Sequence, residues 1–265
     1  MMALGIGAGG LAWGAKADPT LPTRSFGKTG RTLPLIGLDG RAISHGPEEK
    51  TGQMIAAAIA AGMTFFDTSM NHMDGRSERR YGKFLASNDR DRIFIQSRTM
   101  SRTKPVAATN VDLALARLNM DYLDSFLMDS AITSPVDDQI ETPNPDVFEA
   151  FIAARQAGKV RNIGVRAEAD TALVQRLLDQ YGAEIDLVML PFALPESDEA
   201  IVKARKLGVG IIADVDKNTQ KKWTPTNDGP FKFPDYITSW ILSFNRPKDV
   251  NTFTKRARGL AEKSA

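Results

Sequence analysis

The chain has 265 residues, of which 42% are hydrophobic and 25% are charged, and these proportions are typical of one soluble globular domain. A formal net charge of +2, with no long run of Lys and Arg, excludes the basic footprint of a nucleic-acid or membrane-surface partner. The absence of cysteine excludes disulfides, thiolate metal sites, iron–sulfur clusters and cysteine nucleophiles, but it leaves the cellular compartment open.

The N-terminal segment, residues 1–17, is apolar, rich in Gly and Ala, and ends in an A-x-A cleavage pattern at residues 15–17. It is too short to span a bilayer, and it is typical of the apolar part of an export signal. The basic segment that should precede it is absent, so either the start has been placed late or these residues form a disordered tail. We expect an exported, periplasmic protein with its domain at residues 18–265, and a cytoplasmic location is the alternative.

Apolar runs typical of strands then alternate with helical patterns. Strands are expected at residues 33–38, 63–67, 92–97, 124–128, 160–165, 186–190 and 209–213. Residues 236–244 are expected to form a helix and residues 250–253 a candidate eighth strand, after a long polar loop at residues 214–233. The alternation predicts a single-domain α/β fold, a (β/α)8 barrel of the TIM type, because eight such units close a parallel sheet.

The most informative stretch is residues 59–85, IAAGMTFFDTSMNHMDGRSERRYGKFL. It is typical of a helix that ends at Gly62, a buried strand, a polar loop and a second amphipathic helix. Asp67 therefore lies where a strand gives way to its loop. In a barrel of alternating strands and helices, catalytic groups gather at that end of the strands.

This stretch resembles the strand 2 signature of the aldo/keto reductases, and residues 24–40 resemble the family's opening hairpin and first strand, with Asp39 where the family usually has Gly. The resemblance extends over residues 24–258. It implies a monomeric, NADP(H)-linked oxidoreductase that reduces the carbonyl group of a small molecule. The matching positions of the signature are Gly62, Phe65, Phe66, Asp67, Thr68, Ser69, Gly75, Ser77, Glu78 and Gly82.

The resemblance also implies a catalytic tetrad of Asp, Tyr, Lys and His. Asp67 retains the first member, while His72 stands at the Tyr position, Arg98 at the Lys position and Asp129 at the His position. Carbonyl reduction needs hydride on one side of the carbonyl carbon and a proton for its oxygen. Only one of the four tetrad residues is therefore the residue that the family uses.

Three interpretations of these four residues stay open. In the first, the site is still a reductase site, and His72, biased towards its protonated form by two carboxylates, replaces Tyr as the acid beside the cation Arg98. In the second, Asp67, His72 and Asp129 hold a divalent metal in a hydrolase or lyase, although Arg98 opposes a cation and we assign no metal ligands. In the third, the four residues are a salt-bridged plug in an inactive or altered-ligand barrel that acts as a binding protein.

The predicted cofactor contacts also depart from the family. Arg166 stands where the family uses Ser to bind the nicotinamide amide, Met189 stands at the Gln position, and Phe192 is the aromatic expected to stack on the nicotinamide ring. Asp214 and Asp216 add negative charge where a pyrophosphate would pass, which weakens anion binding.

Basic residues near the C-terminus supply the remaining cofactor prediction. Lys255, Arg256 and Arg258 follow the candidate eighth strand, where the family binds the 2′-phosphate of NADPH through basic side chains. Basic residues in a C-terminal helix are also common on solvated surfaces, so both interpretations stay open.

Overall fold

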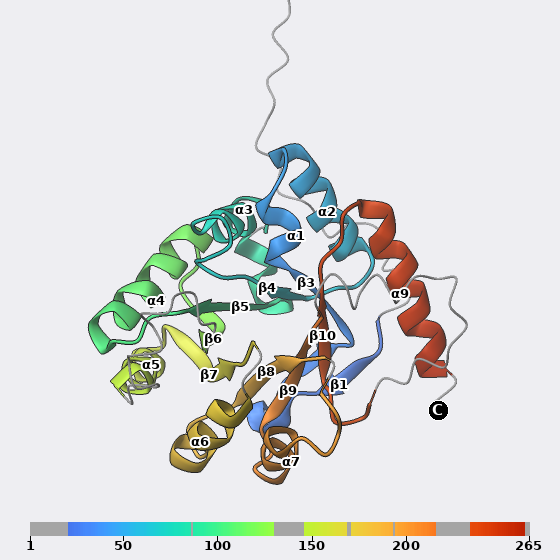
Figure 1. Ribbon diagram of the computed structural model, residues 1–265. Helices are drawn as coiled ribbons and strands as arrows, with labels where there is room; N and C mark the ends of the chain where they lie inside the picture. Colours follow the sequence, from blue (N-terminus) through green and yellow to red (C-terminus); the bar gives the residue numbers. More distant parts are fainter. Residues whose placement is uncertain are drawn as a thin grey trace, which may run out of the picture.

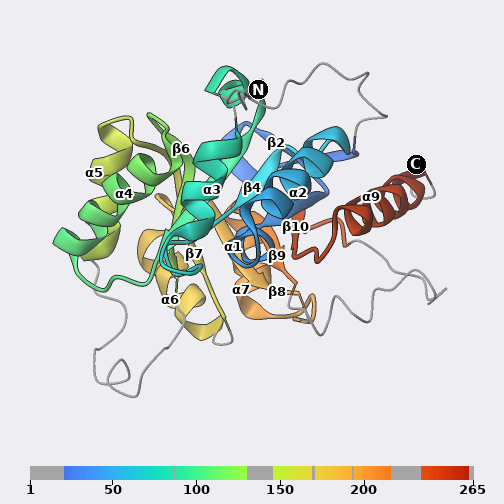
Figure 2. The same cartoon turned by 90° about the horizontal axis from the view of Figure 1, so that it is seen from above.

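A closed barrel of eight parallel strands forms the body of the protein in the computed structural model, which describes residues 21–85, 87–129, 146–168, 171–192, 194–215 and 234–262. The strand order is β10-β3-β4-β5-β6-β7-β8-β9, and helices surround the strands (Figure 1, Figure 2). The predicted (β/α)8 fold is confirmed. The signal-like residues 1–17 and residues 216–233 of the predicted loop, which include Asp216, lie outside the described residues.

The described elements follow the expected alternation of strand and helix. The barrel strands are β3 (Ile36–Asp39), β4 (Phe65–Asp67), β5 (Phe94–Thr99), β6 (Leu123–Asp129), β7 (Val160–Arg166), β8 (Leu187–Pro191), β9 (Gly210–Asp214) and β10 (Ser239–Leu242). The helices are α1 (Gly40–Ser44), α2 (Glu48–Ala60), α3 (Arg76–Phe84), α4 (Lys104–Leu118), α5 (Asp146–Gln156), α6 (Thr171–Tyr181), α7 (Glu199–Lys206) and α9 (Pro247–Glu262), with 3-10 turns at η1 (Gly27–Thr29) and η2 (Ser87–Arg92).

An antiparallel hairpin of β1 (Thr23–Ser25) and β2 (Thr32–Pro34) closes the end of the barrel where the strands begin. It places Phe26 inside the barrel, where its ring meets Phe94 edge-on with 5.5 Å between centroids. Gly210 makes room for this ring, because a Cβ there would lie 2.5 Å from it. The apolar side chains that fill this end of the barrel are Phe26, Leu33, Phe65, Phe94, Leu127, Leu187, Met189, Ile212 and Ile241.

The last strand and helix differ from the prediction. Residues 239–242 form β10, which lies between β9 and β3 and closes the barrel, whereas residues 250–253 lie within α9. The predicted helix at residues 236–244 and eighth strand at residues 250–253 were therefore wrong. The sequence Ser-Trp-Ile-Leu favours a strand because its large side chains pack on a pleated, buried surface, while Val250 is the buried side of an amphipathic helix.

A second apolar layer lies between the strands and the surrounding helices. It includes Ile55 and Ala58 of α2, Val111 of α4 and Phe151 of α5, all of which are buried. In the described part of the chain, no helix has both the length and the apolar character needed to cross a bilayer. The two apolar layers hold the strands in register, so that the residues at the strand ends meet above the inner core.

Candidate functional site

Acidic and basic side chains end several neighbouring strands on the side opposite the hairpin. Asp39 ends β3, Asp67 ends β4, Asp129 ends β6, Arg166 ends β7 and Asp214 ends β9. All five are buried, with at most 7% of the residue exposed. Parallel strands bring these ends together, so residues scattered over most of the chain form one polar cluster above an apolar core.

Two arginines link three of these carboxylates. Arg41, in α1, donates to Asp39 and to Asp214, each at 2.5 Å. Arg166 donates to Asp214 at 2.7 Å and to Asp129 at 2.9 Å. Each carboxylate in this part of the cluster is therefore shared between neighbouring guanidinium groups or hydrogen-bonded to one.

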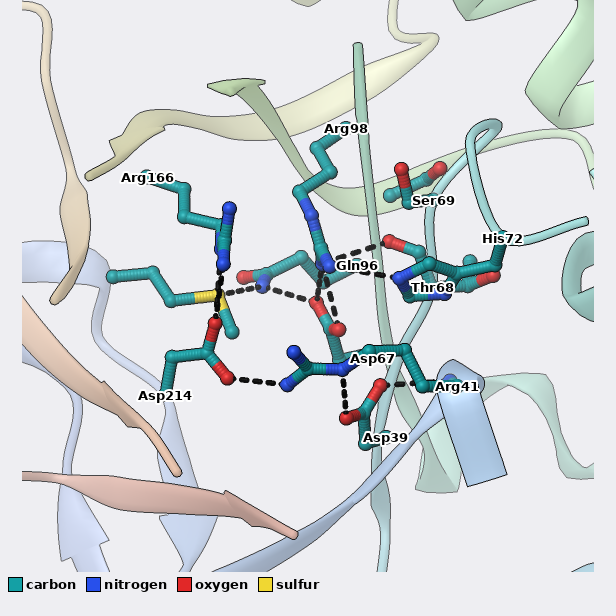
Figure 3. A network of polar contacts seen from close by, with 12 residues as sticks. Asp39, Arg41, Asp67, Thr68, Ser69, His72, Gln96, Arg98, Arg166 and Asp214 are labelled. Atoms are coloured by element: carbon teal, nitrogen blue, oxygen red, sulfur yellow. Dashed lines mark hydrogen bonds and ion pairs between the residues drawn. The ribbon is translucent and has the colours of Figure 1, made fainter. Parts of the chain in front are cut away.

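Arg98 of β5 extends the chain of ion pairs to the fourth carboxylate. It donates to Asp129 at 3.0 Å. It also donates to both carboxylate oxygens of Asp67 at 2.7 Å (Figure 3). These four carboxylates and three guanidinium groups alternate around the mouth of the barrel. We call them the charged ring: Asp39, Arg41, Asp214, Arg166, Asp129, Arg98 and Asp67.

The charged ring has one open position, between Asp67 and Asp39. These two residues are register partners on adjacent strands, and no guanidinium of the described residues bridges them. Burial and the negative charge of Asp39 outweigh Arg98 and raise the pKa of Asp67 to about 6. Burial also disfavours ionisation of Asp39, but Arg41 and other donors outweigh it and lower its pKa to about 2. The ring has more carboxylates than guanidinium groups, and of Asp39 and Asp67 it is Asp67 that takes up a proton more readily.

His72 lies in the loop between β4 and α3, next to the charged ring. Its backbone N–H donates to the carbonyl of Ser69 at 3.1 Å, and its own carbonyl accepts from Arg76 at 3.1 Å. The Arg98 guanidinium lies 3.0 Å from Nε2, and because a guanidinium only donates, Nε2 is the acceptor. Nε2 therefore carries no proton, and the imidazole proton is on Nδ1.

The charge state of His72 differs from the expected one. Burial, followed by the positive charge of Arg98, lowers the pKa of His72 to about 3, and the carboxylate of Asp39 offsets this only in part. The prediction that carboxylates bias His72 towards its protonated form was wrong, because the ring is buried and Arg98 donates directly to it. Nδ1 is buried and has no hydrogen-bond partner among the described residues.

Gly40 permits the close approach of the β4 loop to the first helix. A Cβ at this position would lie 2.8 Å from the carbonyl oxygen of Asp67 and 2.9 Å from Nδ1 of His72. Both distances are shorter than side chains tolerate, so residue 40 fixes how near His72 comes to α1.

Gln96 is a site residue that the sequence analysis missed. It lies two positions before Arg98 on β5, so both side chains point into the barrel. Its amide donates to Asp67 at 2.8 Å and accepts from Ser125 at 3.1 Å. The available signal was a polar residue in a buried strand, two positions before the predicted Arg98. Arg41 was also missed, since its partner Asp214 is distant in sequence.

The structure brings the four predicted tetrad positions together, but it separates the predicted cofactor residues. Arg166 is in the charged ring, and Met189 is buried beneath it with its sulfur 3.6 Å from Nε2 of Gln96. Phe192 follows β8 and is partly buried. The catalytic and cofactor roles of these residues stay predictions.

The predicted 2′-phosphate residues lie on α9. Arg258 donates to the carbonyl of Ala61 at 3.1 Å, and Ala61 lies in the turn between the end of α2 and the beginning of β4. Arg258 is therefore at the hairpin end of the barrel, away from the charged ring, which does not favour a phosphate contact near the site. Lys255 is exposed, and the side chain of Arg256 lies outside the described residues.

The metal interpretation finds no ligand set in the described residues. Within them, no group of three or more His, Asp or Glu side chains is arranged to hold a metal ion. Arg98 lies between Asp67 and Asp129 and donates to both. A guanidinium at that position opposes a divalent cation.

Sequence and structure comparisons give consistent relatives. The pattern of the Aldo/keto reductase family matches residues 38–214. The chain is 28% identical over 215 residues to an aldo-keto reductase of Mycolicibacterium smegmatis, and the aligned region covers 79% of this chain and 70% of that protein. It is 30% identical over 172 residues to 2,5-diketo-D-gluconic acid reductase B of a Corynebacterium species, and the aligned region covers 62% of this chain and 56% of that protein.

Solved structures share the fold at low sequence identity. The holo form of an aldo-keto reductase from Bacillus halodurans superposes with a TM-score of 0.73 at 16% identity, over 89% of this chain and 90% of that one. An aldo-keto reductase of Klebsiella pneumoniae in complex with NADPH superposes with a TM-score of 0.70 at 19% identity, over 90% of each chain.

Proposed function

This chain belongs to the aldo/keto reductase family, and from that premise we propose that it is an NADP(H)-dependent oxidoreductase that reduces a small-molecule carbonyl group at the charged ring. The observation that carries the proposal is the linked set of Asp67, Arg98 and His72. Arg98 donates to the carboxylate of Asp67 at 2.7 Å and to Nε2 of His72 at 3.0 Å. The family resemblance implies an Asp, a Lys and a Tyr at these three positions, so a carboxylate, a cation and a hydrogen-bond donor are all represented.

NADP(H), when bound, supplies the hydride. Relatives of the same fold crystallised with NADPH and NADP support this choice of cofactor. The nicotinamide amide oxygen needs a hydrogen-bond donor, and Arg166 stands at the position that the resemblance assigns to this contact. Its guanidinium donates three bonds to Asp129 and Asp214, and a guanidinium has further N–H groups to offer. Phe192 is the aromatic residue that follows β8, and its backbone N–H donates to the carbonyl of Asp214 at 3.0 Å, so the residue types present fit this end of the cofactor.

His72 is the residue that we assign to the carbonyl oxygen. As a neutral imidazole it donates through the proton on Nδ1, and a neutral imidazole polarises a carbonyl group without being an imidazolium. Nδ1 is buried beside Gly40 in this structure, so this role requires the loop after β4 to open towards the substrate. Arg98 orients the ring and offsets the negative charge that develops on the oxygen. Asp129 adds little repulsion there, since Arg98 and Arg166 neutralise it.

A second function is favoured by a specific observation. Arg98 cannot act as an acid, and the low pKa of His72 leaves almost no imidazolium at neutral pH. The charged ring therefore has no strong acid to protonate a substrate. This arrangement also fits a binding protein that has lost hydride transfer. The two functions differ in whether the cofactor binds and turns over.

The test is a titration of the purified protein with NADPH, followed by nicotinamide fluorescence, with NADH in parallel. Micromolar binding of NADPH, followed by turnover in a screen of aldehydes and ketones, is the expected result. The matched variant is His72→Phe, which we expect to bind NADPH, remain folded and lose turnover. No binding up to millimolar cofactor would overturn the reductase proposal and favour the binding protein, and equal rates for both proteins would overturn the role of His72.

A further inference from the structure

We propose that Gln96 is a positioning residue of this site, whose amide holds the carboxylate of Asp67 at the open position of the charged ring. The inference rests on the proposed function, because Asp67 orients Arg98 and Arg98 orients His72. Gln96 is completely buried, two residues before Arg98 on the same strand. It therefore acts from beneath the ring, out of reach of a substrate.

The open position explains why a neutral donor is needed there. Asp39 and Asp67 face each other from β3 and β4, and both are completely buried. Asp39 has Arg41 and the hydroxyl of Ser243, at 2.6 Å, as donors. Asp67 has Arg98 on one side and a like charge on the other. A further donor on Asp67 stabilises its ionised form without adding a charge to the ring.

The contacts of Gln96 orient its amide for this purpose. Its Nε2 donates to Oδ1 of Asp67 at 2.8 Å, and its Oε1 accepts from the hydroxyl of Ser125 at 3.1 Å. Ser125 is its register partner on β6 and is also completely buried. Because an ionised carboxylate only accepts, the nitrogen end of the amide faces Asp67, and the Ser125 hydroxyl, which can donate or accept, donates to the oxygen.

Other charged and titratable groups surround Asp67. Arg98 lies on β5, and Asp39 lies beside Asp67 on β3. Tyr81 of α3 donates to the carbonyl of Leu38 at 3.0 Å. His72 follows in the next loop and is linked through Arg98. Tyr81 directs its proton elsewhere, so the side-chain donors on the Asp67 carboxylate within the described residues are Arg98 and Gln96.

The test follows the ionisation of Asp67 directly in the full chain. The side-chain carboxyl carbons of ¹³C-labelled protein are titrated by NMR, and Asp67→Asn identifies the signal of Asp67. Gln96→Met removes the donor while keeping the length of the side chain, and we expect it to raise the titration midpoint of Asp67 by about one pH unit. An unchanged midpoint would overturn the proposal.

Two further variants separate hydrogen bonding from packing. Ser125→Ala leaves the amide of Gln96 in place, so its midpoint should rise less than that of Gln96→Met; an equal rise would overturn the proposal. Gln96→Leu also removes the donor without adding a charge and serves if Gln96→Met does not fold. The midpoint of Asp67 should rise in this variant too, and no rise would contradict the inference.

The titration needs no turnover, so it distinguishes this inference from the proposed function. If the enzyme turns over, Gln96→Met should lower kcat and shift its pH dependence together with the Asp67 midpoint, while the KM for NADPH stays the same. Normal turnover with an unchanged Asp67 midpoint would overturn the positioning role of Gln96 and leave the proposed reductase function intact. A shifted midpoint without any turnover would support the role of Gln96 and contradict the reductase function.

Discussion

His72 and Asp67 are ionisable groups of the same site whose environments act in opposite directions. Burial and Arg98 favour the neutral imidazole and lower the pKa of His72 to about 3. Burial and Asp39 favour the neutral carboxylic acid and raise the pKa of Asp67 to about 6. Between pH 3.8 and 6, the folded protein therefore binds fewer protons than the unfolded chain at His72 and more protons at Asp67. The two effects on stability oppose each other over this interval.

Removing one of these groups should reveal its own contribution, as the difference in stability between wild type and the variant. A depressed histidine pKa makes the folded state more stable as pH rises from 3 to 6.5, so wild type should gain about 1.4 kcal/mol per pH unit relative to His72→Phe in that window. A raised carboxyl pKa has the opposite sign, so wild type should lose about as much per pH unit relative to Asp67→Asn between pH 3.8 and 6. Urea unfolding of the three proteins from pH 4.5 to 7 measures both differences. Differences that do not change with pH, or that share one sign, would contradict this assignment.

The first helix and the loop after β4 form the structural support of the site. Asp39 ends β3 and accepts from the backbone N–H of Arg41 at 2.8 Å, so the same carboxylate caps α1 and belongs to the charged ring. Gly40 follows at the first position of α1 and leaves space for the β4 loop. The helix start and the position of His72 are therefore coupled through a residue without a side chain.

Gly40→Ala should test this coupling. The added Cβ would meet the Asp67 carbonyl and the His72 ring at less than 3 Å, so we expect a loss of about 1–3 kcal/mol in the free energy of unfolding. The imidazole ¹⁵N signals of His72 should also shift, and they are readily assigned because the chain has two histidines. Gly259→Ala, in α9, is the matched control: it has no atom within 4 Å of the new Cβ and should gain up to about 1 kcal/mol from helix propensity. Equal losses in both variants would show that residue 40 has no special role.

At the scale of the whole molecule, barrel closure creates contacts that the sequence does not display. The alternation of apolar runs predicted the barrel, because strand and helix periodicity is local, and the β4 signature placed Asp67 correctly at a strand end. The last strand was misassigned, since short apolar runs fit either kind of element. The ion pair between Arg41 and Asp214 spans 173 positions and depends on β3 and β9 flanking β10, so no local pattern indicates it. The neutral state of His72 was missed for the same reason, because burial and the direction of the Arg98 side chain are tertiary features.

The charged ring should also determine how the barrel responds to the loss of one cation. Arg98→Met leaves Asp67 and Asp129 without their shared partner in a site where both are buried, and removing one partner of buried ion pairs costs about 3–5 kcal/mol. Lys159→Met removes a surface cation paired with Asp112, where both side chains are about half exposed, and should cost less than about 1 kcal/mol. Urea unfolding at neutral pH, at low and at high salt, measures both costs. The cost of Arg98→Met should change little with salt because buried pairs are screened less, whereas equal costs for the two variants would mean that the ring contributes no more than a surface pair.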